Sequence, residues 1–432
     1  MDEASLQPRL RATPFRIDGQ TSDEIPPRLN PGSPKILYVG DVPVERSYHG
    51  SALLYRLLEL HAAGLTVVET GNASSSSRRL PRVSYSSLAL ANPRWLNTRF
   101  HSYVSAYSSF AATRAPEELN RLVENVECDC VLTVAHGFGW LTAARLAETR
   151  QVPLHLIVHD DWPRVARVPH AFRPWLDRRF GEVYRQARSR LCVSPAMRDA
   201  YERRYGSGAE VLYPIRSQDY SDGNSATRRP NDAIFTVAFA GSINSQGYVD
   251  ALKTLHRVLT RIGGRLLIFG PVNETDAKTY GLDLANITLR GLLDWPELIV
   301  RLREEADVLF VPMSFAKSDG PNMRLAFPSK LADYTAVGAP LLVYGPQYCS
   351  AVRWANENPG ACEAVCVDDE EILAGAVQRF ASSPTHRERL GKRALEVGRR
   401  YFSHEQVQKI FDEALAPSTV QTTLATAAVS CR

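Results

Sequence analysis

The 432-residue chain has little of what marks membrane, secreted or metal-stapled proteins. It holds no apolar run near the roughly 18 residues that a membrane-spanning helix needs. Its first thirty residues carry charges and prolines in place of the apolar core of a secretory signal. The seven cysteines are odd in number and form no Cys-x-x-Cys pair, which argues against a disulfide framework or a zinc site. We therefore expect a cytoplasmic protein with reduced cysteines and no bound metal.

Lysine is scarce, since only 7 of the 51 basic residues are lysines. Residues 1–216 carry 28 Lys and Arg against 22 Asp and Glu, whereas residues 217–432 carry 23 against 25. A mildly basic first half suits an anionic acceptor, a membrane surface or nucleic acid, and it equally suits an ordinary solvated surface.

Short apolar stretches alternate with helical ones along most of the chain. The alternation begins with an apolar stretch at 35–40 and a helical one at 49–63, stops in the polar segment 216–233, and restarts at 235–240. Strands that are apolar on both faces and alternate with helices predict parallel sheets covered on both sides. We expect an α/β protein with two doubly wound, Rossmann-like domains that face one another across a cleft.

The polar segments also set the expected domain boundaries. Residues 1–34 and 417–432 show little periodicity and predict a disordered arm and a tail. The segment 216–233 predicts an interdomain linker, so the two domains should span 35–215 and 234–416.

The segment 321–346 contains the most informative pattern. Pro328 stands where a helix should begin, and Gly338 stands where it should end. Lys330 and Asp333 then share one face of this helix. A helix N-terminus attracts anions, a lysine adds a charge suited to phosphate, and a carboxylate accepts hydrogen bonds from ribose hydroxyls. The pattern suits a nucleoside diphosphate, and a surface helix with a Lys–Asp pair explains it equally well.

The motif Pro-Ser-Lys-x-x-Asp-Tyr-x-x-x-Gly-x-Pro, which starts at Pro328, resembles the donor-site helix of GT-B glycosyltransferases. It is most similar to the retaining family four and to relatives with a Pro-x-Lys-x-x-Glu-Tyr variant. Segments 193–197, 239–243 and 307–312 resemble the same enzymes in the same order. The resemblance covers about residues 35–414. It implies a GT-B fold with an acceptor-binding first domain, a second domain for a UDP- or GDP-sugar, and C-terminal helices that return to the first domain.

By this resemblance the residues at the donor are Gly241, Ser242, Lys330, Asp333 and Gly291. Two departures affect the expected charge at the diphosphate. Leu325 stands in place of the first glutamate of the family's paired-glutamate motif, and the Arg/Lys pair after the glycine turn is absent. Lys330, Arg324 or Lys317 would then supply the positive charge. No Asp-x-Asp motif is present, so we expect transfer without a metal ion.

Polar residues follow predicted strands of the first half. His159 and Asp160 come at the end of one strand, and His136 follows another. Ligands bind at the carboxyl ends of such strands. Asp160 or Asp161 would deprotonate an acceptor hydroxyl if the transfer inverts, whereas His159 would hydrogen-bond the sugar if it retains. The alternatives are an aspartate that caps a helix beside a buried histidine and, for His136, an ordinary turn.

The stretch 78–116 is rich in arginine and aromatic residues and contains no acid before Glu117. Such a surface suits an acceptor, a lipid headgroup or nucleic acid, and a core helix with exposed arginines has the same composition. No recognised nucleic-acid module accompanies it, so we expect no nucleic-acid partner. Peripheral contact with the inner face of the membrane remains an alternative.

We expect a hexosyltransferase-like enzyme that moves a sugar from a nucleotide-diphosphate sugar to a hydroxyl acceptor. The acceptor would be a glycan, as in polysaccharide biosynthesis, a lipid-linked glycan or a small molecule. Catalysis would rest on positioning and on stabilisation of the leaving diphosphate. The alternatives are a UDP-sugar epimerase and a non-catalytic GT-B protein that binds a sugar nucleotide or scaffolds a partner.

Overall fold

The computed structural model describes residues 12–13, 33–46, 50–71, 79–90, 98–216, 234–243 and 245–416. The predicted linker from residue 217 onward, the predicted tail and most of the predicted N-terminal arm lie outside the described residues, so the domain boundaries remain predictions. Within the arm, Ala12–Thr13 forms a short strand, β1.

The first half of the chain forms an eight-stranded sheet in the order β1-β4-β3-β2-β5-β6-β7-β8. After β1, its strands are β2 (Ile36–Gly40), β3 (Leu65–Glu69), β4 (Ser84–Leu88), β5 (Cys130–Val134), β6 (Leu154–Val158), β7 (Ser189–Cys192) and β8 (Glu210–Val211). All of them pair in parallel except β1, which runs antiparallel to β4. Every residue of β2, β5 and β6 is buried, as expected for strands covered by helices on both faces.

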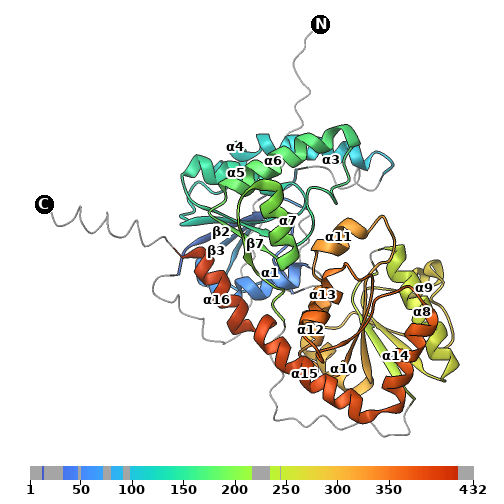
Figure 1. Cartoon of the computed structure of the whole chain (residues 1–432). Coiled ribbons are helices and arrows are strands. Elements are labelled where there is room, and N and C mark those ends of the chain that lie inside the picture. Colours follow the sequence, from blue (N-terminus) through green and yellow to red (C-terminus); the bar gives the residue numbers. More distant parts are fainter. Residues whose placement is uncertain are drawn as a thin grey trace, which may run out of the picture.

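The second half forms a six-stranded parallel sheet in the order β11-β10-β9-β12-β13-β14. Its strands are β9 (Thr236–Ala240), β10 (Arg265–Phe269), β11 (Ile287–Gly291), β12 (Val308–Pro312), β13 (Leu341–Tyr344) and β14 (Glu363–Val365). The predicted fold class, α/β with two doubly wound parallel sheets, is therefore confirmed. The two halves lie next to one another, each with helices around its sheet (Figure 1).

The helices around the first sheet are α1 (Gly50–Leu58), the 3₁₀ segment η1 (Glu59–Gly64), α3 (His101–Arg114), α4 (Pro116–Leu122), α5 (Gly139–Arg150), the 3₁₀ segment η2 (His170–Phe172), α6 (Arg173–Gln186) and α7 (Pro195–Tyr205). Those of the second half are α8 (Gln246–Arg261), α9 (Glu274–Tyr280), α10 (Trp295–Glu305), α11 (Gly320–Leu325), α12 (Ser329–Tyr334), α13 (Ser350–Glu357), α14 (Glu370–Ser382), α15 (Pro384–Phe402) and α16 (His404–Leu415). None of the helices in the described part of the chain combines the length and the apolar character needed to cross a bilayer.

Local sequence signals explain where several of these helices begin and end. Ser194 starts α7, because its Oγ accepts a hydrogen bond from the backbone N–H of Met197 at 3.1 Å. Gly206 ends the same helix in the left-handed conformation, with φ of +73°. The sequence pattern does not predict α3, because its buried face holds only small or polar residues and its large aromatic residues are exposed.

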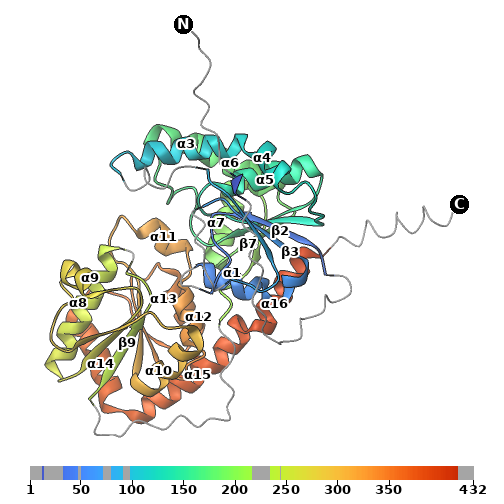
Figure 2. The same cartoon turned by 180° about the vertical axis from the view of Figure 1, so that it is seen from behind.

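The last two helices join the halves of the molecule. Figures 1 and 2 show α15 and α16, in red, running from the second half to the first. Val407, Phe411 and Leu415 of α16 belong to the same buried cluster as Leu54 of α1 and Leu132 of β5. The final helix is therefore part of the core of the first half, although it is the last element of the chain.

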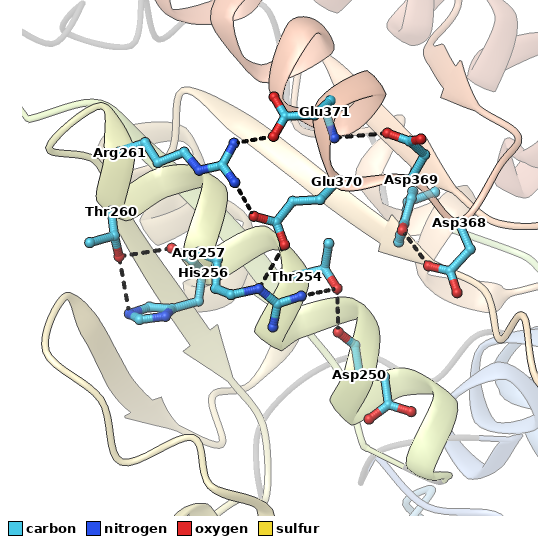
Figure 3. Close-up of polar contacts among 11 residues, drawn as sticks. Asp250, Thr254, His256, Arg257, Thr260, Arg261, Asp368, Asp369, Glu370 and Glu371 are labelled. Atoms are coloured by element: carbon cyan, nitrogen blue, oxygen red, sulfur yellow. Dashed lines mark hydrogen bonds and ion pairs between the residues drawn. The ribbon is translucent and has the colours of Figure 1, made fainter.

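An exposed polar network holds α14 against α8 on the outer side of the second half (Figure 3). Arg257 Nε and Arg261 Nη1 lie 2.7 Å from carboxylate oxygens of Glu370 and Glu371, respectively. Asp369 caps α14 by accepting from the backbone N–H of Glu371 at 2.9 Å. None of these residues lines the cavity between the halves, and exposed pairs of this kind contribute at most about 1 kcal/mol each. The network supports the fold rather than a site.

Candidate active site between the two sheets

A cavity of about 1430 Å³ lies between the two halves and is lined by both. The strand order reverses between β2 and β5 in the first sheet and between β9 and β12 in the second, and a crevice opens at each reversal outside the carboxyl ends of the strands. Asp41 and His136 follow β2 and β5, while Gly241 and Met313 follow β9 and β12, and all four line the cavity. The two crevices therefore share one space.

On the side of the second sheet, Lys330 reaches the glycine turn after β9. Gly241 has φ of +143° and donates its N–H to Phe269 O at 2.8 Å. A Cβ on Gly241 would lie 3.3 Å from Lys330 Cε and 3.4 Å from its Nζ. The Nζ stands 4.4 Å from the ring centre of Phe239 and 4.7 Å from that of Tyr248. Burial lowers the pKa of Lys330 to about 7, and no carboxylate among the described residues offsets this. The arrangement suits an anion.

Asp333 lies one turn further along α12 and does not pair with Lys330. Its Oδ1 accepts a hydrogen bond from Arg56 Nη1 of α1 at 2.7 Å, and the two side chains are 4% and 9% exposed. Arg56 Nη1 also donates to Ile215 O at 3.0 Å. The alternative of a solvent-exposed Lys–Asp pair is therefore wrong, because both residues line the cavity and the carboxylate is bound from the other half of the molecule.

On the side of the first sheet, the two aspartates after β6 differ in their surroundings. Asp161 is fully buried, and its Oδ1 accepts from Arg204 at 2.9 Å and from Tyr201 at 3.2 Å. Asp160 is partly exposed, lines the cavity, and accepts from Asn322 Nδ2 of α11 at 3.3 Å. Of the two candidates for contact with an acceptor hydroxyl, Asp160 is the one that faces the cavity, while Asp161 is part of the supporting structure.

The two predicted histidines both line the cavity. Burial lowers the pKa of His159 to about 4, while the Asp160 carboxylate opposes the shift and His136 adds to it. His159 is therefore neutral near pH 7 and can donate or accept a hydrogen bond without carrying a charge. His136 is exposed, and its ring centre lies 5.5 Å from that of Trp162.

Asp41 is a further cavity residue that the sequence analysis did not identify. Its Oδ2 accepts from the backbone N–H groups of Phe138 and Gly139 at 2.9 and 2.6 Å. Burial raises the pKa of Asp41, and these N–H groups together with His136 oppose the shift. A Cβ on Gly137, whose φ is +55°, would lie 2.2 Å from Asp41 Cγ, so this approach requires glycine. An acid directly after a buried strand, the signal that pointed to Asp160, was also present here.

The remaining predicted donor residues divide into two groups. Ser242 lines the cavity, and Gly291 lies just before its wall at 292–295, with its carbonyl accepting from Gly270 N at 2.8 Å. Arg324 and Lys317 are exposed and lie outside the cavity wall, with the Arg324 guanidinium 4.3 Å from the ring centre of Tyr348. Lys330 is thus the one predicted diphosphate cation that the described structure places at the glycine turn.

No cluster of three or more His, Cys, Asp or Glu side chains within the described ranges is arranged to hold a metal ion. Transfer without a metal remains a prediction.

Comparison with known proteins gives the class. Residues 59–215 match the model of Glycosyltransferase Family 4. Among solved structures, the chain is similar to Alr3699/HepE from Anabaena in complex with UDP and glucose, at 13% identity and a TM-score of 0.62, over 88% of this chain and 99% of that one. It is also similar to sucrose-phosphate synthase from Thermosynechococcus elongatus, at 17% identity and a TM-score of 0.63, over 91% of this chain and 100% of that one. A third similar structure is α,α-trehalose 6-phosphate synthase from Burkholderia multivorans, at 15% identity and a TM-score of 0.60, over 91% of this chain and 99% of that one.

No curated protein sequence matches the chain. At these identities the solved structures establish the fold, which is GT-B, and the family match over residues 59–215 carries the activity. The protein is a glycosyltransferase of GT-B fold. Its expected resemblance to the family-four enzymes is confirmed over the matched residues.

Proposed function

We propose that the protein transfers a sugar from a UDP-sugar to a hydroxyl group of an acceptor, without a metal ion, so that a chelator leaves turnover unchanged. The observation that carries this proposal is Lys330, a half-buried lysine without a carboxylate partner among the described residues, whose Nζ lies beside the open backbone of Gly241. UDP is preferred over GDP because the Anabaena protein was solved with UDP and with UDP-glucose.

In this proposal the second sheet holds the donor. Lys330 and the backbone at Gly241 and Ser242 bind the diphosphate, Asp333 binds the ribose, and the wall that follows Gly291 receives the base. As the bond between the sugar carbon and the diphosphate oxygen breaks, negative charge grows on the diphosphate. A cation already placed there stabilises that charge without reorganisation.

The first sheet holds the acceptor. Asp160 accepts a hydrogen bond from the attacking hydroxyl and takes its proton as the new bond to the sugar forms. His159 stays neutral beside Asp160, and His136 and Asp41 complete the wall around the hydroxyl. These groups are fixed by the strand ends that carry them, so the protein supplies orientation as well as proton transfer.

A thermal-shift panel of UDP, GDP and ADP tests the donor assignment. A nucleotide that binds the folded protein stabilises it by roughly 2.7 kcal/mol at a hundred times its dissociation constant. We expect UDP to raise the thermal midpoint most. If none of the three nucleotides raises it, the proposal is contradicted. Slow hydrolysis of a UDP-sugar without acceptor then separates an enzyme from a scaffold that only binds.

We also propose peripheral contact with an anionic membrane surface through α3. Phe100 precedes this helix, and it is 46% exposed, while Tyr103, Tyr107 and Phe110 are 69%, 53% and 47% exposed. Their spacing of three, four and three residues puts them on one face of the helix. Aromatic and basic side chains together favour a lipid interface. We expect the protein to sediment with phosphatidylglycerol vesicles and the Tyr103→Ser/Tyr107→Ser variant to remain in solution; equal sedimentation of both would contradict this.

A further inference from the structure

Arg56 belongs to α1 of the first half, but its charged end is bound by the second half. It is 8% exposed. Its Nη1 donates to Asp333 Oδ1 at 2.7 Å, and its guanidinium carbon lies 4.8 Å from the ring centre of Trp295, the first residue of α10. Arg56 therefore lies between Asp333, the carboxylate assigned to the ribose, and Trp295, the last residue of the wall at 292–295 that is assigned to the base; all three line the cavity.

The second arm of this guanidinium is incomplete. Arg56 Nη2 is buried and has no hydrogen-bond partner among the described residues. An arginine normally engages a carboxylate with two parallel hydrogen bonds, whereas only one nitrogen is used here. A buried N–H group without an acceptor is costly, and because Arg56 lines the cavity, an oxygen of a bound ligand can supply the missing acceptor.

We propose that Arg56 is a second ribose-binding residue and that it completes the nucleotide site from the opposite half of the protein. The inference rests on the proposed function, in which Asp333 binds the ribose. A ribose hydroxyl can donate its hydrogen to the Asp333 carboxylate and accept a hydrogen from Arg56 Nη2 through its own oxygen. The two adjacent hydroxyls of the ribose can also bind one to Asp333 and the other to Arg56, so that Arg56 Nη2 gains the acceptor that it lacks.

The positions of the neighbouring residues support this assignment. Lys330 and Asp333 follow one another along α12, and Arg56 connects Asp333 to Trp295. The spatial order of these side chains matches the order of groups along a nucleotide: Lys330 for the diphosphate, Asp333 with Arg56 for the ribose, and Trp295 for the base. Because Arg56 comes from the first half, a nucleotide held in this way engages both halves at once.

The test is the discrimination between ribose and deoxyribose, measured by calorimetry with UDP, 2′-deoxy-UDP and 3′-deoxy-UDP. The wild-type protein should bind at least one deoxy form roughly tenfold to a hundredfold more weakly than UDP, as expected for the loss of a charge-assisted hydrogen bond. Arg56→Lys keeps a positive charge next to Asp333 but loses the planar second arm. We expect this variant to weaken UDP by a similar factor and to discriminate clearly less between UDP and the deoxy forms than the wild type, with the remaining discrimination due to Asp333.

Arg46→Lys is the matched control. Arg46 lines the same cavity from the first half and also lies over an aromatic ring, that of Tyr55, at 5.5 Å, but its ring partner belongs to its own half. The Arg46→Lys control should bind UDP and its deoxy forms with the same ratio of dissociation constants as the wild-type protein. If Arg56→Lys does not fold, as judged by its thermal midpoint, Arg56→Gln takes its place, because glutamine keeps an N–H donor. The ratio of the dissociation constants of the deoxy forms and UDP in the wild-type protein can be measured in either case.

Three results would overturn the inference. Unchanged discrimination in Arg56→Lys would mean that Arg56 only joins the two halves. Tighter UDP binding in that variant would mean that the Arg56–Asp333 pair obstructs the ribose. Equal affinity of the wild-type protein for UDP and both deoxy forms would exclude ribose recognition altogether. After either of the first two results, weaker UDP binding by Lys330→Ala would leave the proposed function intact, whereas the third result would also remove the ribose role of Asp333. Absence of UDP binding by the wild-type protein would remove both the inference and the proposed function.

Discussion

We expect Asp160→Asn to lower the turnover number by ~10²–10⁴-fold and to leave the dissociation constant of UDP near its wild-type value. Asp160 lines the cavity at the end of β6, and the asparagine side chain cannot take a proton from the acceptor hydroxyl. The donor site lies on the other sheet, so nucleotide binding should not depend on this carboxylate. Steady-state kinetics with a UDP-sugar and its acceptor, combined with calorimetry, measure the two effects separately.

Asp161→Asn is the matched control for this experiment. Asp161 is the next residue, but it is buried and bound by Arg204 and Tyr201. Its replacement leaves the Arg204 charge with a weaker partner and should lower the free energy of unfolding, with little effect on the turnover of the folded protein. Wild-type turnover in Asp160→Asn would show that the acceptor hydroxyl is not deprotonated by Asp160.

We expect Lys330→Ala to weaken UDP by about tenfold to a hundredfold, which corresponds to the roughly 1.5–3 kcal/mol of a charge-assisted hydrogen bond. Uridine lacks the diphosphate, so its affinity should hardly change. Asp333→Ala should weaken both ligands, because both contain the ribose. Equal affinity of the wild-type protein and Lys330→Ala for UDP would contradict the placement of the diphosphate at this residue.

The lowered pKa of Lys330 adds a pH dependence with a definite sign. Its pKa is about 7 in the empty protein, so the amine is largely neutral above that pH, whereas the diphosphate binds the charged form. Binding above pH 7 must therefore take up a proton, and the affinity for UDP should fall as the pH rises from 7 towards 9. Calorimetry in two buffers with different ionisation enthalpies measures the uptake. Lys330→Arg, which stays charged, should bind UDP without it.

The sequence by itself determined the fold class. Each strand next to an order reversal, β2, β5, β9 and β12, is buried at every position, so each appears in the sequence as an apolar run, with one threonine in β5 and one in β9. The ends of α7 are equally visible, because a capping serine and a left-handed glycine act within a few residues of the helix. The same local signals placed Lys330, Gly241, Asp160 and His159 at the ends of strands or the start of a helix, where ligands bind in such folds.

Only the tertiary structure decided which side chains meet. Arg56 and Asp333 are 277 positions apart, and Asp41 lies 97 and 98 positions from the two N–H groups that it binds. Arg324 and Lys317 have the charge that a diphosphate needs, but they lie outside the cavity wall. The physical reason is that strand order and the packing of the two halves bring distant residues together, and such contacts leave no periodic trace along the chain. Local periodicity records burial, whereas the composition of the site depends on how the buried elements are arranged.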